Sequence, residues 1–414
     1  MTKIFFTIIS FSLGSIINCR AQNNNQLNFY VENALRNSPL LKDYQNQVQS
    51  SVYDSLLIRA SYKPHITANS YNLYAPVIKG IGYDKAITNG ANFSTLAGVN
   101  KQLPNKKVLS AQFQNIQIQN QIISNTSAIS EQDLKKMIIA QYITAYGDLQ
   151  QLNFNREIND LLSKEETILK KLTQKNVYKE VDYLAFLVTL QQQSLFIKQL
   201  TIQFQNDYAT LNYLSGITDT AFALLQEPGI ILNPLPAVEQ SVFFKKYKID
   251  SLKLNNDKAL IDAAYEPKIN LFADGGYNSS LAYQAHKNFG TSFGVSASIP
   301  IYDGKQKKMQ YSKISIAEKT RADYKDFFLR QYSQQIAQLM QQLAATDELI
   351  TAINSQVKYS DALIVVNGKL LQAGELRVTD YVLAINNYLN AKNQLTQNTI
   401  NRLQIINQVN YWNR

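Results

Sequence analysis

Cysteine and histidine are almost absent from this 414-residue sequence. The one cysteine is Cys19, and the two histidines, His65 and His286, lie far apart in the chain. A single cysteine excludes an internal disulfide, and two distant histidines do not form a metal-binding motif. The sequence also has no C-x-x-C, H-E-x-x-H or G-x-S-x-G motif and no phosphate-binding glycine loop. We therefore predict a protein that is not an enzyme and that needs no cofactor or metal.

Acidic residues are in the minority. The chain has 41 Lys and Arg against 31 Asp and Glu, a formal net charge of +10. The basic residues are spread along the chain and form no arginine-rich arm, which argues against a nucleic-acid partner. A solvated, lysine-rich helical surface explains the balance more simply.

Proline is missing from two long stretches, and glycine is nearly missing from both. Residues 105–175 contain only Gly147, and residues 305–373 contain only Gly368. Proline costs about 3 kcal/mol inside a helix, so its absence permits a continuous helix over each stretch. Both stretches are rich in Gln, Ala, Leu, Ile and Lys. We predict two helices of roughly 105 Å each, at a rise of about 1.5 Å per residue.

The second stretch carries apolar residues at a seven-residue spacing. The seven-residue repeat comprises Ile336, Leu343, Ile350, Val357 and Ile364. Leu339 follows Ile336 by three positions, and Ile353 follows Ile350 by three positions. Such a heptad is typical of a helix that packs along a neighbour in a coiled coil. Gln, Asn and Ser fill much of the remaining surface, so we expect one buried seam on a mainly polar helix.

The N-terminus has the layout of a secretory signal peptide over residues 1–21. Lys3 precedes the apolar run IFFTIISFSLGSIIN, and Ala21 is a small residue suited to the position before cleavage. An uncleaved anchor is the alternative, but the polar QNNNQ that follows argues against it. Cys19 is a candidate lipid-anchor cysteine, although Asn18 is larger than the residues favoured before such sites. No later apolar run is long enough for a transmembrane helix, so strands must hold the protein in any membrane it enters.

One short motif occurs twice. Residues 60–66 read ASYKPHI, and residues 263–269 read AAYEPKI. Proline disfavours helix in the residue before it, and the side-chain pattern becomes alternating after each copy. Each copy therefore marks the point where a helix becomes a strand. We predict strands near 65–78, 91–103, 268–278 and 291–302.

The last predicted strand shows the clearest alternation. One face carries Phe293, Val295, Ala297, Ile299 and Ile301, and the other carries Ser292, Gly294, Ser296 and Ser298. Strands of about ten residues with one apolar face are typical of a membrane barrel. A soluble antiparallel sheet with one wet face alternates in the same way and remains an alternative. Candidates for interfacial aromatic girdles are Tyr71, Tyr74, Tyr277, Phe289, Phe293 and Tyr302.

The duplicated motif divides the chain into two structural repeats. The first covers residues 22–215, the linker 216–238 follows, and the second covers residues 239–414. Each repeat reads as helix, strand, loop, strand, long helix, turn and return helix. This order predicts an α+β membrane protein with long antiparallel coiled-coil helices and four strands per chain. Four strands cannot close a barrel, and open edges are not viable in lipid, so three chains would supply twelve strands.

At this level of organisation the sequence resembles the TolC-like outer-membrane efflux proteins, also called outer membrane factors. The resemblance spans residues 27–412 and rests on ALRNSPLL (34–41), ASYKPHI, LNYLSG (211–216), AAYEPKI, SIPIYDGKQKK (298–308) and AGELRVTDYVLA (373–384). It implies a homotrimer with a twelve-stranded β-barrel in the outer membrane and a long α-helical barrel in the periplasm. It also implies a passive channel of a tripartite efflux or type I secretion system that exports small molecules. The implied partners are a periplasmic adaptor (membrane fusion) protein, an inner-membrane pump of RND or ABC type, and outer-membrane lipid.

The resemblance further implies a periplasmic aperture at the turns that follow the long helices. In the family, two aspartates three residues apart constrict this mouth and bind cations. Asp380 occupies the first position and Leu383 the second, so the second acidic ring is expected to be absent. Asp182 is the equivalent of Asp380 in the first repeat, and Lys179 and Arg377 are candidates to pair with the aspartates in a closed state. Alternatively, the aspartates cap their return helices, where Asp is favoured.

A different class of function fits the same patterns. A soluble periplasmic coiled-coil adaptor or scaffold would use the same heptads and would carry a sheet with polar edges. Membrane residence separates the two hypotheses.

Overall fold

The computed structural model describes residues 26–84, 86, 90–219, 222–281 and 284–413. The predicted signal peptide, with Lys3, Cys19 and Ala21, lies outside the described residues. The chain divides into two units, which are considered separately. The hairpin unit takes the described parts of residues 1–37, 137–230 and 350–400, and the sheet unit takes those of residues 38–136, 231–349 and 401–414.

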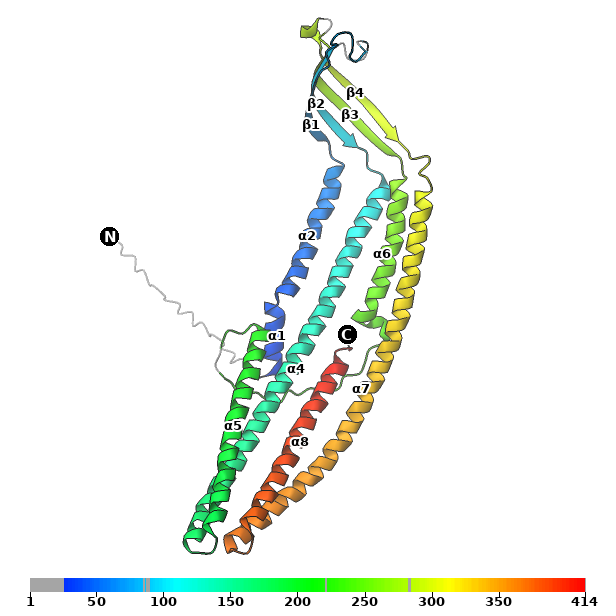
Figure 1. Ribbon diagram of the computed structural model, residues 1–414. Coiled ribbons are helices and arrows are strands. Elements are labelled where there is room, and N and C mark those ends of the chain that lie inside the picture. Colours follow the sequence, from blue (N-terminus) through cyan, green and yellow to red (C-terminus); the bar gives the residue numbers. More distant parts are fainter. Residues whose placement is uncertain (1–25, 85, 87–89, 220–221, 282–283, 414) are drawn as a thin grey trace, which may run out of the picture. The chain divides into compact units, whose positions relative to one another are not determined.

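Helices make up most of the described chain (Figure 1). They are α1 (Leu27–Asn37), α2 (Pro39–Ser61), α4 (Lys106–Gln174), α5 (Glu180–Ser215), α6 (Val242–Ala264), α7 (Gln306–Ala373) and α8 (Val378–Asn410), with 3-10 turns at Val238–Gln240 and Ala285–Lys287. Helix α4 has 69 residues and α7 has 68, which confirms the two long helices predicted from the proline-free stretches. Among the described residues, no helix combines the length and the apolar character needed to cross a membrane.

Local chemistry explains where several helices begin and end. The Ser38 hydroxyl accepts a hydrogen bond from the Leu41 amide at 3.4 Å, and Pro39 occupies the first turn of α2, so α1 and α2 are separate helices. Helix α5 ends at Gly216, whose φ of 66° is the left-handed conformation that glycine adopts without strain.

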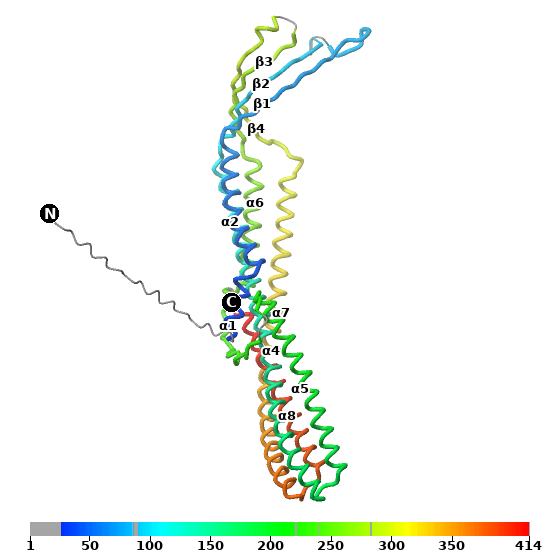
Figure 2. Tube along the Cα trace, turned by 90° about the vertical axis from the view of Figure 1, so that its left-hand side faces the viewer, coloured from blue at the N-terminus to red at the C-terminus, as the bar shows by residue number. Residues whose placement is uncertain are grey.

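The four strands form one antiparallel sheet in the order β1-β2-β3-β4 (Figures 1 and 2). They are β1 (His65–Tyr74), β2 (Ala91–Gln102), β3 (Lys268–Ser279) and β4 (Phe289–Ser298). The predicted fold class, with long helices and four strands per chain, is confirmed in the single chain. Strand β4 ends at Ser298, before the predicted end near residue 302, because Pro300 has no amide hydrogen to donate. Strand β1 likewise ends at Tyr74, just before Pro76.

The strand register separates an apolar face from a polar face. One row across the four strands joins Ile66, Val99, Ala273 and Phe293, and the adjacent row joins Thr67, Gly98, Asp274 and Ser292. Successive residues of a strand point to opposite faces, so the two rows lie on opposite sides of the sheet. The Ser292 hydroxyl donates to the Asp274 carboxylate at 2.8 Å on the polar side.

Two aromatic residues depart from the simple alternation. Phe272 lies on the polar face opposite Gly294, and a Cβ at Gly294 would come within 2.5 Å of the Phe272 ring. The ring therefore covers a glycine, which accounts for its place in the pattern. Tyr71 pairs with Ser94 on the polar face as well, whereas Phe293 lies on the apolar face. Because the strand period of two puts Tyr71 and Phe293 on opposite sides of the sheet, the two residues cannot belong to the same girdle.

The heptad of α7 forms a buried seam. Leu339, Leu343, Ile353 and Ile364 are buried, and Ile336, Ile350 and Val357 are half-buried. Most positions between them are exposed. The seam therefore has the narrow form that the seven-residue spacing predicts.

Candidate functional site: the tips of the helix hairpins

The hairpin unit contains two helical hairpins whose turns have the same backbone design. The Val177 amide donates to the Leu172 carbonyl at 3.0 Å, and the Glu375 amide donates to the Leu370 carbonyl at 2.9 Å. The residue before each donor, Asn176 or Gly374, has a left-handed backbone with φ of 59° or 79°. Both turns are Schellman motifs, which close a helix with a residue type that tolerates positive φ. The internal repeat thus extends to the hydrogen bonds of the turns.

The two tips contact each other within the hairpin unit. A Cβ at Gly374 would come within 2.7 Å of Val177 Cγ1, so the first turn fits closely over the second. The Tyr178 hydroxyl lies 2.9 Å from the carbonyl oxygen of Leu371 and 2.8 Å from that of Leu376, and it donates to this pair of acceptors. A side chain of the first turn therefore binds the backbone of the second.

A hydrophobic core supports the tips from within the helices. Its buried members are Phe154, Ile158, Leu162, Leu169, Phe186, Ile364, Leu371, Val378, Tyr381, Ala384 and Ile385, from α4, α5, α7 and α8. Tyr381 is fully buried beside Gly368, where a Cβ would lie 3.7 Å from the ring. Its burial raises the pKa of the Tyr381 hydroxyl. Gly368, the one glycine predicted inside this long helix, thus makes room for an aromatic ring of α8.

The structure brings together one of the two predicted charge pairs. Arg377 Nε lies 2.9 Å from Asp380 Oδ2, and Arg377 Nη2 lies 3.0 Å from Oδ1. These hydrogen bonds raise the pKa of the Arg377 guanidinium. The first turn is different, because Lys179 contributes its backbone carbonyl to the Asp182 amide at 3.1 Å. In the described chain, no ion pair joins the side chains of Lys179 and Asp182.

The aspartates do not occupy the capping position itself. Lys179 is the residue that caps α5, without a side-chain capping bond, and Arg377 directly precedes α8. Asp182 and Asp380 are each the third residue of their helix, so the capping alternative needs correction in its detail. A carboxylate in the first turn still interacts favourably with the helix dipole. Leu383, at the second family position, is 59% exposed one turn after Asp380.

Two buried carboxylates in the hairpin unit carried no sequence signal. Glu165 is 6% exposed, and its Oε1 accepts from Gln372 Nε2 at 3.0 Å while its Oε2 has no hydrogen-bond partner. Burial raises the pKa of this carboxyl group. Both Glu165 and Gln372 belong to long polar helices where many similar residues face solvent, so only the packing distinguishes them.

Asp148 is the second buried carboxylate. Asp148, on α4, accepts a hydrogen bond from Gln203 Nε2 of α5 at 3.0 Å. Asp207, also on α5, lies beside Asp148. Burial is the main cause that raises the pKa of Asp148 to about 7, and the Asp207 carboxyl adds to the shift. Asp207 itself accepts from Gln141 Nε2 at 3.1 Å.

The described residues contain no group of three or more His, Cys, Asp or Glu side chains that would suit a metal ion. The tips carry a carboxylate in the first turn of α5 and of α8, with Lys179 and Arg377 directly before those helices.

No protein-family model and no curated protein matches the chain. Solved structures do match it. CusC, described for its transmembrane channel formation, has a TM-score of 0.72 and 15% identity, over 94% of this chain and 92% of that one. The outer membrane protein VceC from Vibrio cholerae has a TM-score of 0.71 and 14% identity, over 94% and 96% of the two chains. The open MtrE outer membrane channel of Neisseria gonorrhoeae has a TM-score of 0.68 and 12% identity, over 94% and 88%. Over nearly its whole length, the chain has the fold of these outer-membrane channel proteins.

Proposed function

We propose that three copies of this chain form a passive TolC-like channel in the outer membrane. The observation that carries the proposal is the four-stranded sheet with β1 and β4 at its edges. Backbone groups on an edge strand cannot stay unpaired in lipid, where each costs several kcal/mol. Pairing β4 of one copy with β1 of the next would remove every edge, and three copies would close a barrel of twelve strands.

The side chains of the sheet support residence in lipid. On the apolar face, Phe293 is 88% exposed and Val295 is 68% exposed in the single chain. Water-facing strands rarely carry such a row, whereas lipid-facing strands of a membrane barrel do. The polar face, with Asp274 and Ser292, would line the lumen.

The helices also leave apolar surface for neighbouring copies. In the sheet unit, Tyr53 and Leu57 of α2 are exposed, and in the hairpin unit, Ile202 and Tyr213 of α5 are exposed. Helices of a closed α-barrel would cover such residues by packing against the next copy. In this arrangement the helices extend into the periplasm, and the tips meet a periplasmic adaptor protein and an inner-membrane pump of RND or ABC type. The transported cargo would be small molecules selected by the pump.

The soluble adaptor hypothesis is less well supported. The matches to outer-membrane channels cover both the sheet and the long helices, at 94% of this chain. An adaptor would have no use for an apolar sheet face of this exposure.

The decisive experiment is the native mass of protein extracted in mild detergent from outer membranes washed with alkaline carbonate. We expect a particle of three chains that stays in the membrane through the wash. A monomer or dimer released into the soluble fraction would overturn the channel and favour the adaptor.

The aperture of this channel is formed by Asp182 and Asp380, which supply six carboxylates in a trimer. The ion pair of Arg377 with Asp380 holds part of this charge neutral in the closed state. Replacing both aspartates by Asn should abolish most of the block by divalent cations in single-channel recordings. A double variant that conducts and is blocked like the parent channel would refute this role while leaving the trimer intact.

A further inference from the structure

The junctions between helices and strands gather basic residues at one end of the sheet. Strands β1 and β3 begin there, and β2 and β4 end there. The four junctions together carry nine basic residues: Arg59, Lys63, Lys101, Lys106, Lys107, Lys268, Lys305, Lys307 and Lys308. They carry three carboxylates, Asp262, Glu266 and Asp303. The sheet register therefore brings together charges that are far apart in the sequence.

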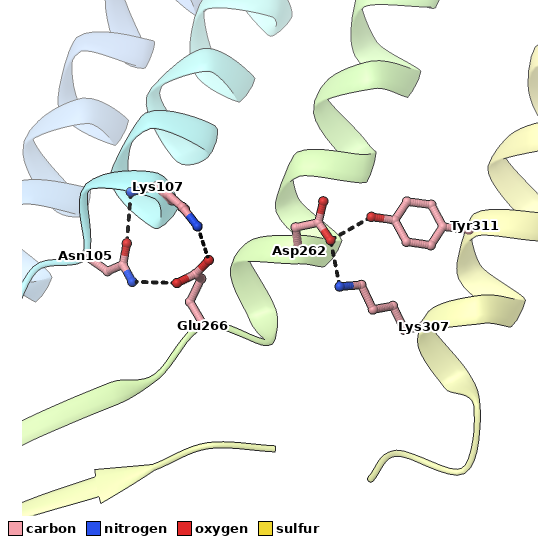
Figure 3. Close-up of polar contacts among 6 residues, drawn as sticks. All are labelled: Asn105, Lys107, Asp262, Glu266, Lys307 and Tyr311. Carbon is pink, nitrogen blue, oxygen red and sulfur yellow. Dashed lines mark hydrogen bonds and ion pairs between the residues drawn. The ribbon is translucent and has the colours of Figure 1, made fainter. Parts of the chain in front are cut away.

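The carboxylates of this region are already engaged, and Figure 3 shows two of them, Asp262 and Glu266. Glu266 binds Lys107 Nζ at 3.0 Å and Asn105 Nδ2 at 3.2 Å, and Figure 3 shows these groups meeting between α4 and the end of α6. Asp262 binds Lys307 Nζ at 2.8 Å and accepts from the Tyr311 hydroxyl at 2.6 Å.

The third carboxylate, Asp303, accepts from the Tyr265 hydroxyl and from the Lys307 amide. Hydrogen bonding to Tyr265 is the main cause that lowers the pKa of Asp303, so this group is ionised at neutral pH. The acidic residues thus serve to fix the helix ends and neutralise only a third of the basic charge.

Five of the seven remaining basic side chains are considered as a site for an external anion. Lys63, Lys106, Lys268, Lys305 and Lys308 are exposed. Within the described part of the chain, none of them takes part in an ion pair. We call these five residues the basic collar.

Apolar side chains directly adjoin the collar. Ile301 is 96% exposed and Tyr302 is 83% exposed, and they lie a few residues before Lys305 and Lys308. Ile66 is likewise exposed after Lys63. Exposed apolar and aromatic residues next to lysines are typical of the boundary between hydrocarbon and headgroups, because a lysine stem crosses apolar surface while its ammonium stays at the polar level.

The other end of the sheet lacks this concentration. Its connecting segments, residues 75–90 and 280–288, contain Lys79, Lys85 and Lys287 against Asp84. The excess of basic charge is thus larger at the end from which the helices leave.

We propose that the basic collar binds the phosphate groups of anionic phospholipids in the membrane leaflet nearer the helices. The inference rests on the proposed outer-membrane channel and adds a lipid partner and its site. Clustered lysines at a membrane surface attract anionic lipids, and the effect of each lysine is lost within a Debye length. The channel would thereby fix its depth in the membrane by charge as well as by its apolar band.

The test uses the detergent-extracted full-length trimer incubated with equal amounts of phosphatidylglycerol and phosphatidylethanolamine. Lipids retained by the trimer are counted by native mass spectrometry. We expect phosphatidylglycerol to be enriched several-fold. The variant Lys63→Gln/Lys106→Gln/Lys308→Gln should lose most of this several-fold enrichment. The corresponding Arg variant, which keeps the charges, should retain it.

A matched control removes the same charge elsewhere. Lys253, Lys319 and Lys358 are exposed on α6 and α7, each at least eleven residues from the end of its helix at the sheet, or more than about 16 Å along the helix. Their triple Gln variant should bind phosphatidylglycerol like the parent. The parent trimer should also retain phosphatidylglycerol in a buffer with inorganic phosphate, to the same extent as in a chloride buffer of equal ionic strength.

The outcomes separate the two proposals. A trimer that holds both lipids equally, or that responds alike to collar and control variants, overturns the collar and leaves the channel standing. Enrichment that inorganic phosphate abolishes and chloride does not would assign the site to the free anion and overturn the lipid assignment. A protein that forms no membrane trimer would overturn both.

Discussion

In each of the two hairpins an aspartate of the long helix binds a side chain of the return helix, but the chemistry of the contact differs. In the first, Asp148 of α4 accepts from Gln203 of α5, and in the second, Asp347 of α7 accepts from Arg402 of α8 at 2.6 Å. The two partners are 55 positions apart in both cases. One pair thus joins a buried carboxylate to a neutral amide, and the other joins a half-exposed carboxylate to a cation. Each long helix thus carries an aspartate that binds its return helix, but the partner is neutral in one hairpin and cationic in the other.

The buried carboxylate of the first hairpin predicts a dependence of stability on pH. The raised pKa means that the folded chain keeps the Asp148 proton to a higher pH than the unfolded chain does. The contribution to stability is therefore complete at a pH below the ordinary Asp value and is lost as the pH rises toward about 7.

The largest effect is expected from Asp148→Asn, which removes the titratable carboxyl group of the first hairpin. The variant should lose most of the decline in stability between about pH 4 and pH 7, a change of a few kcal/mol at roughly 1.4 kcal/mol per pKa unit. Helix melting followed by circular dichroism at pH 5 and pH 8 measures it. Gln203→Arg should act in the same direction by giving Asp148 the partner that Asp347 has. An unchanged pH dependence in both variants would show that Asp148 is ionised in the folded chain at neutral pH.

The next effect concerns the two Schellman turns, which use Asn176 in one hairpin and Gly374 in the other. Gly374→Ala should destabilise the chain by roughly 1–3 kcal/mol, because the backbone is left-handed and the new Cβ would clash with Val177. Asn176→Gly should change stability by less than about 1 kcal/mol, since glycine suits the same backbone. Melting temperatures of the two variants test this asymmetry. Equal effects would mean that the close contact of the tips is not maintained in solution.

A smaller effect is expected from two tyrosines of the first hairpin, because Tyr178 binds the second hairpin whereas Tyr183 binds its own. Tyr178→Phe removes the hydroxyl that binds Leu371 and Leu376 and should cost about 1–2 kcal/mol. Amide hydrogen exchange over residues 371–378 should become faster. Tyr183→Phe removes only a bond to Glu166, so exchange over that segment should not change. Fast amide exchange over this segment in the parent protein would contradict the hydrogen bonds of Tyr178 to the second turn.

The smallest effect sharpens the contrast between the charges of the two turns. Arg377→Gln frees Asp380 from its ion pair and should strengthen cation block of the channel several-fold. Lys179→Gln should have no such effect, because Lys179 makes no side-chain pair with Asp182 in the described chain. Single-channel currents at increasing divalent concentration provide the measurement. Equal shifts in the two variants would indicate a general field effect of the removed charge.

Much of the fold followed from local sequence patterns. The absence of proline over 105–175 and 305–373 predicted α4 and α7, and the heptad identified the buried seam of α7. The repeated Tyr-x-Pro motif located the start of β1 and β3. These features were predictable because helix propensity, proline stereochemistry and side-chain period act over a few residues.

The site was predictable only in part. Arg377 and Asp380 are three residues apart on one helix end, a spacing at which side chains meet, so their pairing followed from the sequence. Lys179 and Asp182 have the same spacing and remain apart. Glu165 and Asp148 gave no signal, because their burial depends on residues of other helices that are distant in the chain.

The sequence by itself determined the order of the elements, the positions of the turns and the length of the long helices, since each depends on neighbouring residues. Only the tertiary structure decided which carboxylates are buried, which tip residues touch and which face each aromatic residue of the sheet occupies. It also decided that nine basic residues from four distant segments meet at one end of the sheet. The physical reason is that burial, clustering of charge and strand register are properties of pairs of segments, and no single segment encodes them.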